Sequence, residues 1–285
     1  MALIASEPVY RGFDRAALEK LYGSLDANVV LATADVHTLF SALLPVSAIA
    51  AVSVFAVYVV VARFVWRRSV GETLIGTLSA GQVNSNNIGI PLSLYLLGSA
   101  AYPAPVILLQ LIVFTPITMA IFEAISTGQR RAWPILRRTL TNPLVVGSVL
   151  GVAVSLSGID LPAMVYEPAR LIADACVPVL LISYGISLYG QRVLGASGRR
   201  RDILLASALK LFVMPLVAWS TARFMFGLDD HDVLVITVLA ALPTAQNVFN
   251  YAQRFDVGET IARDTVFLTT LGCVPALLLI TVLLG

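Results

Sequence analysis

Charged residues are scarce in this sequence. Asp, Glu, Lys and Arg make up 13% of its 285 residues, whereas hydrophobic residues make up 58%. Soluble domains contain about 25% charged residues, so the composition excludes an ordinary soluble protein and indicates an integral membrane protein. The net charge is only +2, which argues against a strongly basic surface, and we expect no nucleic-acid partner.

Cysteine and histidine are also rare, with two residues of each. Cys176 and Cys273 lie singly inside apolar runs, which predicts small buried side chains rather than a disulfide. His37 and His231 have no second ligand at metal-site spacing, and the sequence contains neither an HExxH nor an Asp-rich motif. We therefore expect no metal and no cofactor, and these absences argue against a membrane-embedded enzyme.

Long hydrophobic runs are what the sequence does contain. A membrane-spanning helix needs roughly 20 mainly apolar residues. Eight segments meet this requirement, at about 39–65, 72–97, 103–126, 139–157, 167–190, 203–226, 232–253 and 262–284. The sequence thus predicts an all-α polytopic membrane protein. Residues 1–38 predict a short amphipathic helix followed by a short or degenerate ninth span.

Basic residues are distributed unevenly among the connections between these spans. One alternate set of connections contains 13 of the 19 Lys and Arg residues, while "GSAAYPAP", "SGIDLP" and "GLDDHD" contain none. Short cytoplasmic loops carry the excess of Lys and Arg. We therefore expect a multi-pass protein of the plasma (inner) membrane with cytoplasmic arginine-rich loops and an outside C-terminus. We assign the arginine clusters no role beyond topology.

Two of the spans are interrupted at their centres by polar residues and proline, in "GQVNSNNIGIPL" (81–92) and "LPTAQNVFNYAQ" (242–253). Irregular backbone within a bilayer is tolerated only against protein or a water-filled cavity. Paired interruptions in corresponding places indicate a transporter built from repeats, with its site where the broken helices meet. We predict crossovers at 84–91 and 243–250, in contact with each other, with unwound centres near 84–89 and 243–247.

The chemistry of these interruptions suits a carboxylate. Half-helix N-termini carry partial positive charge, and Asn and Gln side chains add neutral donors and acceptors. For each amide, the alternative is a turn or cap that repairs the broken backbone. The expected substrate ligands are Asn84, Asn86, Asn87, Gln246 and Asn247. Gly89, Pro91 and Pro243 are expected to shape the breaks instead.

Lys210 lies in the apolar run "ILLASALKLFVMPLVAW". We expect its side chain to extend toward the cytoplasmic interface, as long cationic side chains do near the ends of spans. A role as an anion-attracting cation is the alternative.

The interrupted segments resemble those of the auxin efflux carrier family, which includes plant PIN-type carriers and bacterial carriers of malonate and malate. "VNSNNIGIPL" is similar to the fourth helix of that family and "LPTAQNVFNYAQRFDV" to the ninth, and the resemblance covers about residues 40–284. It implies ten spans in two inverted five-helix repeats and a homodimer. It also implies a substrate-facing position for Asn84 and a position near the site for Gln110. We therefore expect Gln110 to be a substrate ligand as well, with a plain interhelical hydrogen bond as the alternative.

The resemblance also implies a division into a scaffold and a transport unit. We expect a truncated scaffold part at 1–38, first-repeat transport helices at 39–126, scaffold helices at 127–202 and second-repeat transport helices at 203–285. Two departures stand out: the family's first helix has no counterpart here, and Val83 replaces a proline of plant members.

We therefore expect a secondary transporter of a small organic anion, a carboxylate, that works by alternating access with an elevator-type motion. Its partners would be that carboxylate and the lipid bilayer. Two alternatives remain open. One is a sodium-coupled organic-anion symporter of the bile-acid carrier type, and the other is a truncated, inactive family member.

Overall fold

The computed structural model describes residues 41–128 and 184–285, together with the single residues Trp133, Arg137, Leu140, Thr141, Met164 and Ile182. All named elements within these ranges are helical, as expected for an all-α protein. The predictions for residues 1–38, for Cys176 and for most of 127–183 lie outside the described residues.

Four continuous helices of the described part are long and apolar enough to cross a membrane. Several contain π-helical turns, written η. The four are Leu43–Val65 (α4 Leu43–Val59, η3 Val60–Val65), Ala104–Thr127 (α7 Ala104–Leu109, η6 Gln110–Phe114, α8 Thr115–Thr127), Arg200–Met225 (α12 Arg200–Ala208, η7 Leu209–Val213, α13 Met214–Ser220, η8 Thr221–Met225) and Glu259–Leu284 (α16). They correspond to four of the spans that the sequence predicts.

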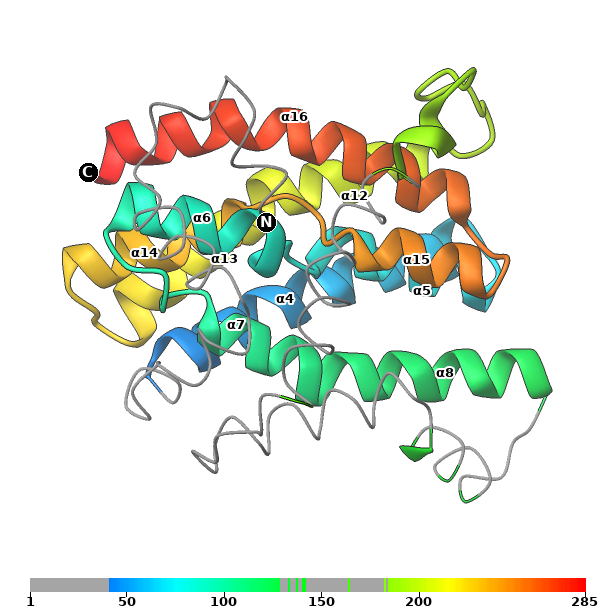
Figure 1. Ribbon diagram of the computed structural model, residues 1–285, viewed down its shortest axis with the longest axis horizontal. Helices are drawn as coiled ribbons and strands as arrows, with labels where there is room; N and C mark the ends of the chain where they lie inside the picture. Colours follow the sequence, from blue (N-terminus) through cyan, green and yellow to red (C-terminus); the bar gives the residue numbers. More distant parts are fainter. Residues whose placement is uncertain are drawn as a thin grey trace.

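The two interrupted segments each form two half-helices separated by a short non-helical stretch. The first consists of α5 (Val70–Gly81), an extended stretch at 82–84, and a second half made of η4 (Ser85–Gly89), α6 (Ile90–Leu92) and η5 (Ser93–Leu97). The second consists of α14 (Asp230–Ala241), a stretch at 242–246, and α15 (Asn247–Arg254). α16 and α8 lie along opposite edges of the described part, with the broken helices between them (Figure 1).

The first break lies closer to the N-terminus than the sequence predicts. Asn86, Asn87 and Gly89 belong to η4, and Pro91 lies in the first turn of α6. Asn is favoured at the start of a helix, and proline is tolerated in the first turn because the N–H groups there have no intrahelical partner. The polar run therefore begins the second half-helix, and only residues 82–84 are unwound.

The helices that lead into the two breaks share one backbone pattern at one constant offset along the chain. Each begins after a turn with a positive φ, at Arg67 (56°) and Gly227 (60°). Each has a side-chain N-cap two residues later, at Ser69 and Asp229. α5 and α14 then both run for 12 residues. This pattern supports a molecule built from two repeats.

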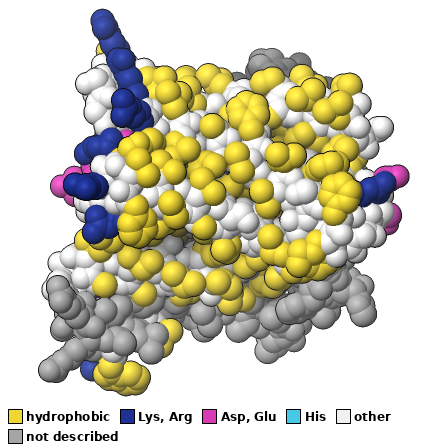
Figure 2. All heavy atoms as spheres, turned by 180° about the vertical axis from the view of Figure 1, so that it is seen from behind, with side chains coloured by type: hydrophobic (Ala, Val, Ile, Leu, Met, Phe, Trp, Pro, Cys, Tyr) yellow, Lys and Arg dark blue, Asp and Glu magenta, His cyan; other side chains and the backbone are white. Residues whose placement is uncertain are grey.

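The two ends of the described part differ in charge. Figure 2 shows Lys and Arg side chains gathered at one end, a small charged group at the other, and hydrophobic side chains over much of the surface between. The second end contains the exposed pair Arg223 and Asp230. Tyr102 and His231 meet there as well, with 2.9 Å between Oη and Nε2. The connections at 98–103 and 226–229 therefore lie together, away from the arginine-rich end.

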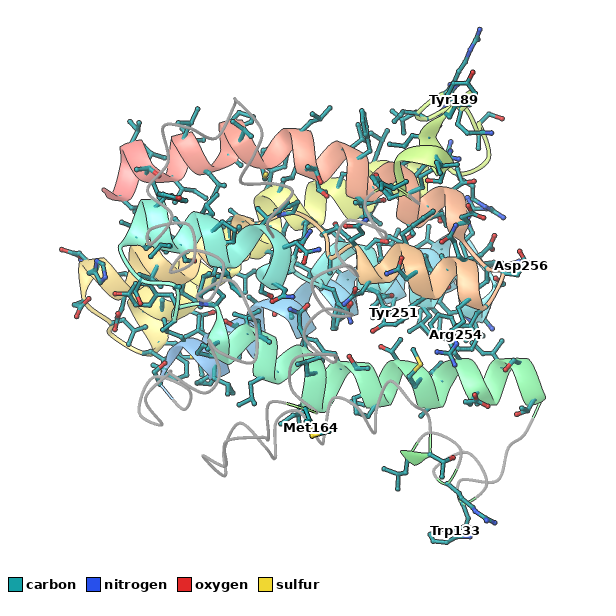
Figure 3. All side chains as sticks on the ribbon, in the orientation of Figure 1. Trp133, Met164, Tyr189, Tyr251, Arg254 and Asp256 are labelled. Carbon is teal, nitrogen blue, oxygen red and sulfur yellow. The ribbon has the colours of Figure 1, made fainter. Side chains whose placement is uncertain are left out.

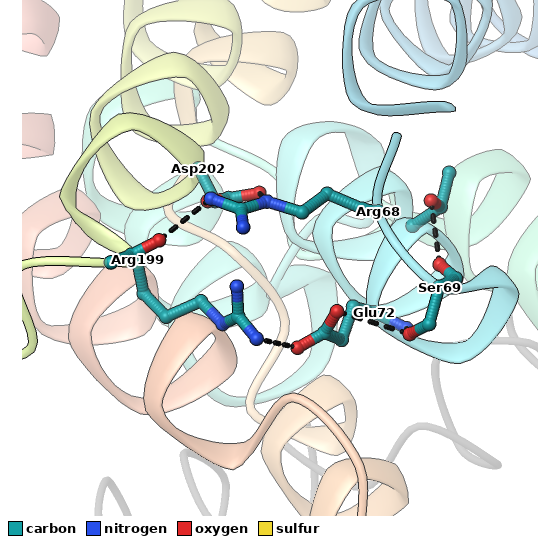
Figure 4. Close-up of polar contacts among 7 residues, drawn as sticks. Arg68, Ser69, Glu72, Arg199 and Asp202 are labelled. Atoms are coloured by element: carbon teal, nitrogen blue, oxygen red, sulfur yellow. Dashed lines mark hydrogen bonds and ion pairs between the residues drawn. The ribbon is translucent and has the colours of Figure 1, made fainter. Parts of the chain in front are cut away.

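An ionic clasp, formed by Arg68, Glu72, Arg199 and Asp202, joins the two repeats at the arginine-rich end (Figure 4). Arg68 donates two hydrogen bonds to the buried Asp202 carboxylate, at 3.0 and 2.6 Å, and Arg199 pairs with Glu72. Hydrogen bonding to Asp202 raises the pKa of the Arg68 guanidinium above its ordinary value, so Arg68 stays charged. The interpretation of the arginine clusters as topology signals alone is therefore incomplete.

A further ion pair lies within the first turns of α16. Arg263, which the sequence places in a basic loop, is 7% exposed and donates from Nε to Oδ1 of Asp264 at 2.9 Å. The other Asp264 oxygen accepts a hydrogen bond from the Leu194 N–H at 2.8 Å. A buried carboxylate needs such partners because its desolvation is costly. The pair therefore fixes the connection before α12 against α16.

Candidate functional site

The two breaks meet at the centre of the described part. Val83 and Thr244 form an antiparallel bridge, in which the Asn84 N–H donates to the Pro243 carbonyl at 2.9 Å. The Ala245 N–H donates in turn to the Gln82 carbonyl at 3.1 Å. The breaks thus satisfy each other's backbone groups, which a bilayer would otherwise leave without partners. The predicted crossing of two broken helices is confirmed.

Thr244 ties the second break to two further helices. Its hydroxyl donates to the Ser79 carbonyl near the end of α5 at 2.7 Å, and its N–H donates to the Thr269 hydroxyl of α16 at 3.1 Å. All three residues are fully buried. Nothing in the sequence pattern singles out Thr244 or Thr269, because threonine is common in membrane helices and both contacts are long-range.

Gln110 performs the corresponding task for the first break. Its Oε1 accepts a hydrogen bond from the Val83 N–H at 2.9 Å, and its Nε2 donates to the Val83 carbonyl at 3.0 Å and to the Ser85 hydroxyl at 2.6 Å. Both hydrogens of the amide nitrogen are therefore used. The structure places Gln110 against the crossing, as the family resemblance implies. Its amide, however, binds the backbone of Val83 and the hydroxyl of Ser85.

Asn84 is the last residue of the first break and caps η4. Its Oδ1 accepts a hydrogen bond from the Asn87 N–H at 3.3 Å, and its backbone carbonyl accepts one from the Gly89 N–H at 2.9 Å. The cap satisfies a helix-start donor, as Asn commonly does. The side-chain nitrogen Nδ2 forms no hydrogen bond with the described residues. Asn84 therefore repairs backbone with one end of its amide and leaves the other end available.

The remaining candidate amides differ in exposure. Asn86 and Asn247 are exposed, Asn87 is partly buried and Gln246 is buried at 4%. Asn86 lies in η4 and Asn247 begins α15, so each exposed amide stands in the first turn of a second half-helix. The partial positive charge of a helix N-terminus is concentrated in that turn.

Gly89 and Pro243 allow the close approach of the two breaks. A Cβ at Gly89 would lie 3.0 Å from Leu242 Cδ1 and 3.4 Å from the Asn84 carbonyl oxygen. Only glycine therefore fits here without displacing a neighbour. Pro243 has no N–H to leave unsatisfied, and its carbonyl accepts the hydrogen bond from Asn84.

Lys210 lies beside the crossing and does not reach the interface. Its side chain is fully buried, and Nζ donates to the Ala240 carbonyl near the end of α14 at 2.7 Å. Nζ also lies 3.2 Å from Met214 Sδ. The expectation of an interfacial lysine is therefore wrong. That expectation followed from the general behaviour of long cationic side chains. The carbonyl that binds Lys210 instead belongs to α14, a neighbouring helix that lies 30 residues further along the chain.

Two cavities adjoin these helices. One, of about 10 Å³, lies against the crossing and is lined by residues that include Gly81, Val83, Gln110 and Ala240. It holds about one water molecule, so it is too small for a carboxylate. The other, of about 380 Å³, lies between α4, α5 and α8 and has an almost wholly apolar lining. A substrate at the crossing would thus meet the side where Asn86 and Asn247 are exposed.

An aromatic cluster fixes the second half-helix α15 against α8. The Phe122 ring of α8 stacks on Phe255 with 4.3 Å between centroids and lies 6.5 Å from Tyr251. Figure 3 shows Tyr251 and Arg254 on the side of α15 that faces α8. Arg254 also lies over the Phe255 ring at 5.6 Å. These contacts fix the C-terminal end of α15 and so help to position its N-terminus, where Asn247 lies.

Comparison with known proteins agrees with this architecture. A family model described as "Membrane transport protein" matches residues 31–281. A "Putative malonate transporter" of Rhizobium meliloti (strain 1021) is 25% identical over 224 residues, which cover 76% of this chain and 69% of that protein.

Plant proteins match a shorter part of the chain. "Auxin efflux carrier component 1" of Arabidopsis thaliana is 28% identical over 155 residues, which cover 53% of this chain and 25% of the plant protein. "Probable auxin efflux carrier component 1b" of Oryza sativa subsp. japonica is also 28% identical over 155 residues, and the match covers 28% of its length. With its two broken helices crossing at the centre, the chain belongs to the membrane transport protein family, the auxin efflux carrier family that its sequence resembles.

Proposed function

We propose that this chain is a secondary carrier that moves a small mono- or dicarboxylate across the membrane and binds it at the crossing of the broken helices. The observation that supports this most directly is the backbone pairing of Asn84 with Pro243. The pairing brings two half-helix N-termini and their amides to one place, which is the arrangement that broken-helix transporters use for anionic groups.

The carboxylate would be bound by neutral donors. Asn84 offers its free Nδ2, and Asn86 and Asn247 offer exposed amides in the first turns of η4 and α15. Asn87 and Gln246 border these positions and complete the proposed set of ligands. Gln110 acts on the substrate through the backbone of Val83, which it holds, so we propose it as a positioning residue.

Transport would proceed by movement of the transport helices of both repeats as one body. The pairing of the two breaks connects these helices, because the Asn84 N–H donates to the Pro243 carbonyl and the Ala245 N–H to the Gln82 carbonyl. We propose that residues 39–126 and 203–285 form the moving unit, that residues 1–38 and 127–202 contribute the scaffold, and that the arginine-rich end faces the cytoplasm.

A ligand screen tests the proposal. Purified protein would be mixed with malonate, malate, acetate and an arylacetate, and its thermal unfolding would be followed with and without sodium. Malonate comes first because the Rhizobium meliloti relative carries that name. A ligand at 100 times its Kd should add about 2.7 kcal/mol to stability, so the unfolding temperature should rise visibly for at least one acid.

Two outcomes of the screen would change the proposal. If no carboxylate shifts the unfolding temperature or competes for binding, the proposed substrate class is wrong. If a carboxylate binds only when sodium is present, the chain is a sodium-coupled symporter instead. Uptake of the best ligand into proteoliposomes then distinguishes a carrier from an inactive family member.

A further inference from the structure

We propose that Lys210 supplies a positive charge to the binding site when an anion is bound and makes the carrier prefer dicarboxylates to monocarboxylates. This inference rests on the proposed function and names the substrate class more narrowly. Lys210 is fully buried in the middle of a membrane-spanning helix. It lies beside the crossing but is not one of the predicted substrate ligands.

Lys210 forms no ion pair with the described residues, so its fully buried amine becomes charged most readily when an anion binds nearby. No carboxylate of the described residues lies within ion-pair distance of its Nζ, and the contacts that Nζ makes there are with the Ala240 carbonyl and Met214 Sδ. A charged side chain within a bilayer is unfavourable and is usually functional. The carbonyl at the end of α14 offsets part of the unfavourable desolvation because a helix C-terminus is negative.

A cation is not needed merely to satisfy such a carbonyl. At the matching end of α5, the Ser79 carbonyl accepts its hydrogen bond from the neutral hydroxyl of Thr244. At the constant offset between the repeats, the counterpart of Lys210 is Ala50, which is also fully buried. The crossing is therefore held by one hydroxyl group, that of Thr244, and by one amine, that of Lys210. Only the amine can carry a positive charge, and it lies on one side of the crossing.

The charge lies close enough to act on a bound anion. Nζ binds the Ala240 carbonyl, and Ala240 is three residues before Pro243, whose carbonyl binds Asn84. Three residues of chain span roughly 10 Å at most, so the distance from Nζ to an anion bound there is on the order of 10 Å. At that separation and an effective dielectric constant of about 20, one unit charge changes the affinity for another by about tenfold or somewhat more. The affinity for a monoanion would therefore rise by about one factor of ten, and the affinity for a dianion by about two factors of ten.

The experiment compares malonate with its monomethyl ester, at a pH where malonate is a dianion, by calorimetric titration of the purified full chain. Lys210→Arg keeps the charge and Lys210→Met removes it. Thr244→Val is the matched control because it removes the neutral tether at the same crossing. Thermal unfolding of each variant reports folding separately from binding.

We expect the parent protein to bind malonate at least about tenfold more tightly than the ester. Lys210→Met should lower the affinity for malonate by about a hundredfold and for the ester by about tenfold, so the preference falls. Lys210→Arg should retain the preference for malonate. Thr244→Val should lower the affinities for malonate and for the ester by the same factor.

Three outcomes would overturn the inference or its basis. A Lys210→Met variant with an unchanged ratio of the two affinities shows that the lysine is only a tether. If that variant does not fold, the parent protein still decides, because equal binding of malonate and the ester contradicts a positive charge beside the bound anion. If neither ligand nor any other carboxylate binds, the proposed function fails as well.

Discussion

Asn84 combines two tasks that the sequence presented as alternatives. Its Oδ1 caps η4 through the Asn87 N–H, while its Nδ2 has no hydrogen bond with the described residues and remains available for a ligand. The two ends of one amide can therefore be tested separately, because Asp keeps the acceptor and replaces the donor with a negative charge.

We predict that Asn84→Asp leaves the unfolding temperature nearly unchanged but abolishes carboxylate binding, since Asp is an equally good cap and repels an anion at low dielectric. Asn84→Ala should lose the cap, about 1 kcal/mol, and should lower affinity by roughly tenfold to a hundredfold, the value of a hydrogen bond to a charged group. Titration and thermal unfolding measure the two effects. Normal binding by Asn84→Asp would mean that Asn84 serves the backbone alone.

At the scale of single residues, the sequence predicts which side chains lie near the crossing better than it predicts what they bind. It identifies Asn84 as a residue near the crossing because amides are unusual inside apolar spans, whereas Gln110 is placed there by the family resemblance. It does not reveal that Gln110 holds Val83, or that Lys210 binds Ala240. Both contacts depend on which helices pack together, and the local pattern around each residue contains no trace of a partner that far away.

At the scale of elements, the ionic clasp and the pair Arg223–Asp230 occupy opposite ends of the molecule. They differ in burial: the Asp202 side chain is 1% exposed and that of Arg68 is 21% exposed, whereas Arg223 and Asp230 are 48% and 87% exposed. Buried pairs are strongly destabilising to break, while exposed pairs contribute little. Of these ion pairs, only those of the clasp should therefore contribute much to stability.

We predict that Arg68→Ala lowers the thermal stability of the purified protein substantially. The loss should be somewhat below the roughly 3–5 kcal/mol of a fully buried pair, because water partly screens Arg68. Adding Asp202→Ala should recover part of the loss, since it removes the uncompensated carboxylate. Arg223→Ala is the control and should change little. Equal effects of Arg68→Ala and Arg223→Ala would show that the clasp does not stabilise the fold.

The sequence predicts the existence of both breaks but misplaces the first. Periodicity and composition mark the segment 84–91 as a poor helix, yet most of it is helical in η4 and α6. The reason is that Asn residues and proline disrupt a helix interior but suit its first turn. The true break, at 82–84, consists of residues whose backbone groups are bound by Pro243, Ala245 and Gln110, all distant in the sequence.

At the scale of the whole molecule, the asymmetry of charge predicts an orientation in the membrane. The arginine-rich end includes the exposed residues Arg192 and Arg201, and the opposite end includes Ser99 and Asp230. Because Lys and Arg are retained on the cytoplasmic side, the two ends should differ in their access from outside the cell.

We predict that an impermeant thiol reagent labels Ser99→Cys and Asp230→Cys in intact cells, in a background without the native cysteines. The same reagent should label Arg192→Cys and Arg201→Cys only after the cells are permeabilised. Labelling by mass shift on a gel measures both. The reverse pattern would place the arginine-rich end outside and would invert the proposed topology.

The reciprocal pairing of the two breaks also has a consequence for synthesis. The ribosome completes residues 82–84 long before it reaches Pro243, and at about 5–20 residues per second the interval is roughly 10–30 s. Within that interval Gln110 is soon available to Val83, but the Asn84 N–H has no Pro243 carbonyl to meet. The nascent chain must therefore shelter an unpaired backbone group from lipid, which makes the first broken helix dependent on the insertion machinery until the second one arrives.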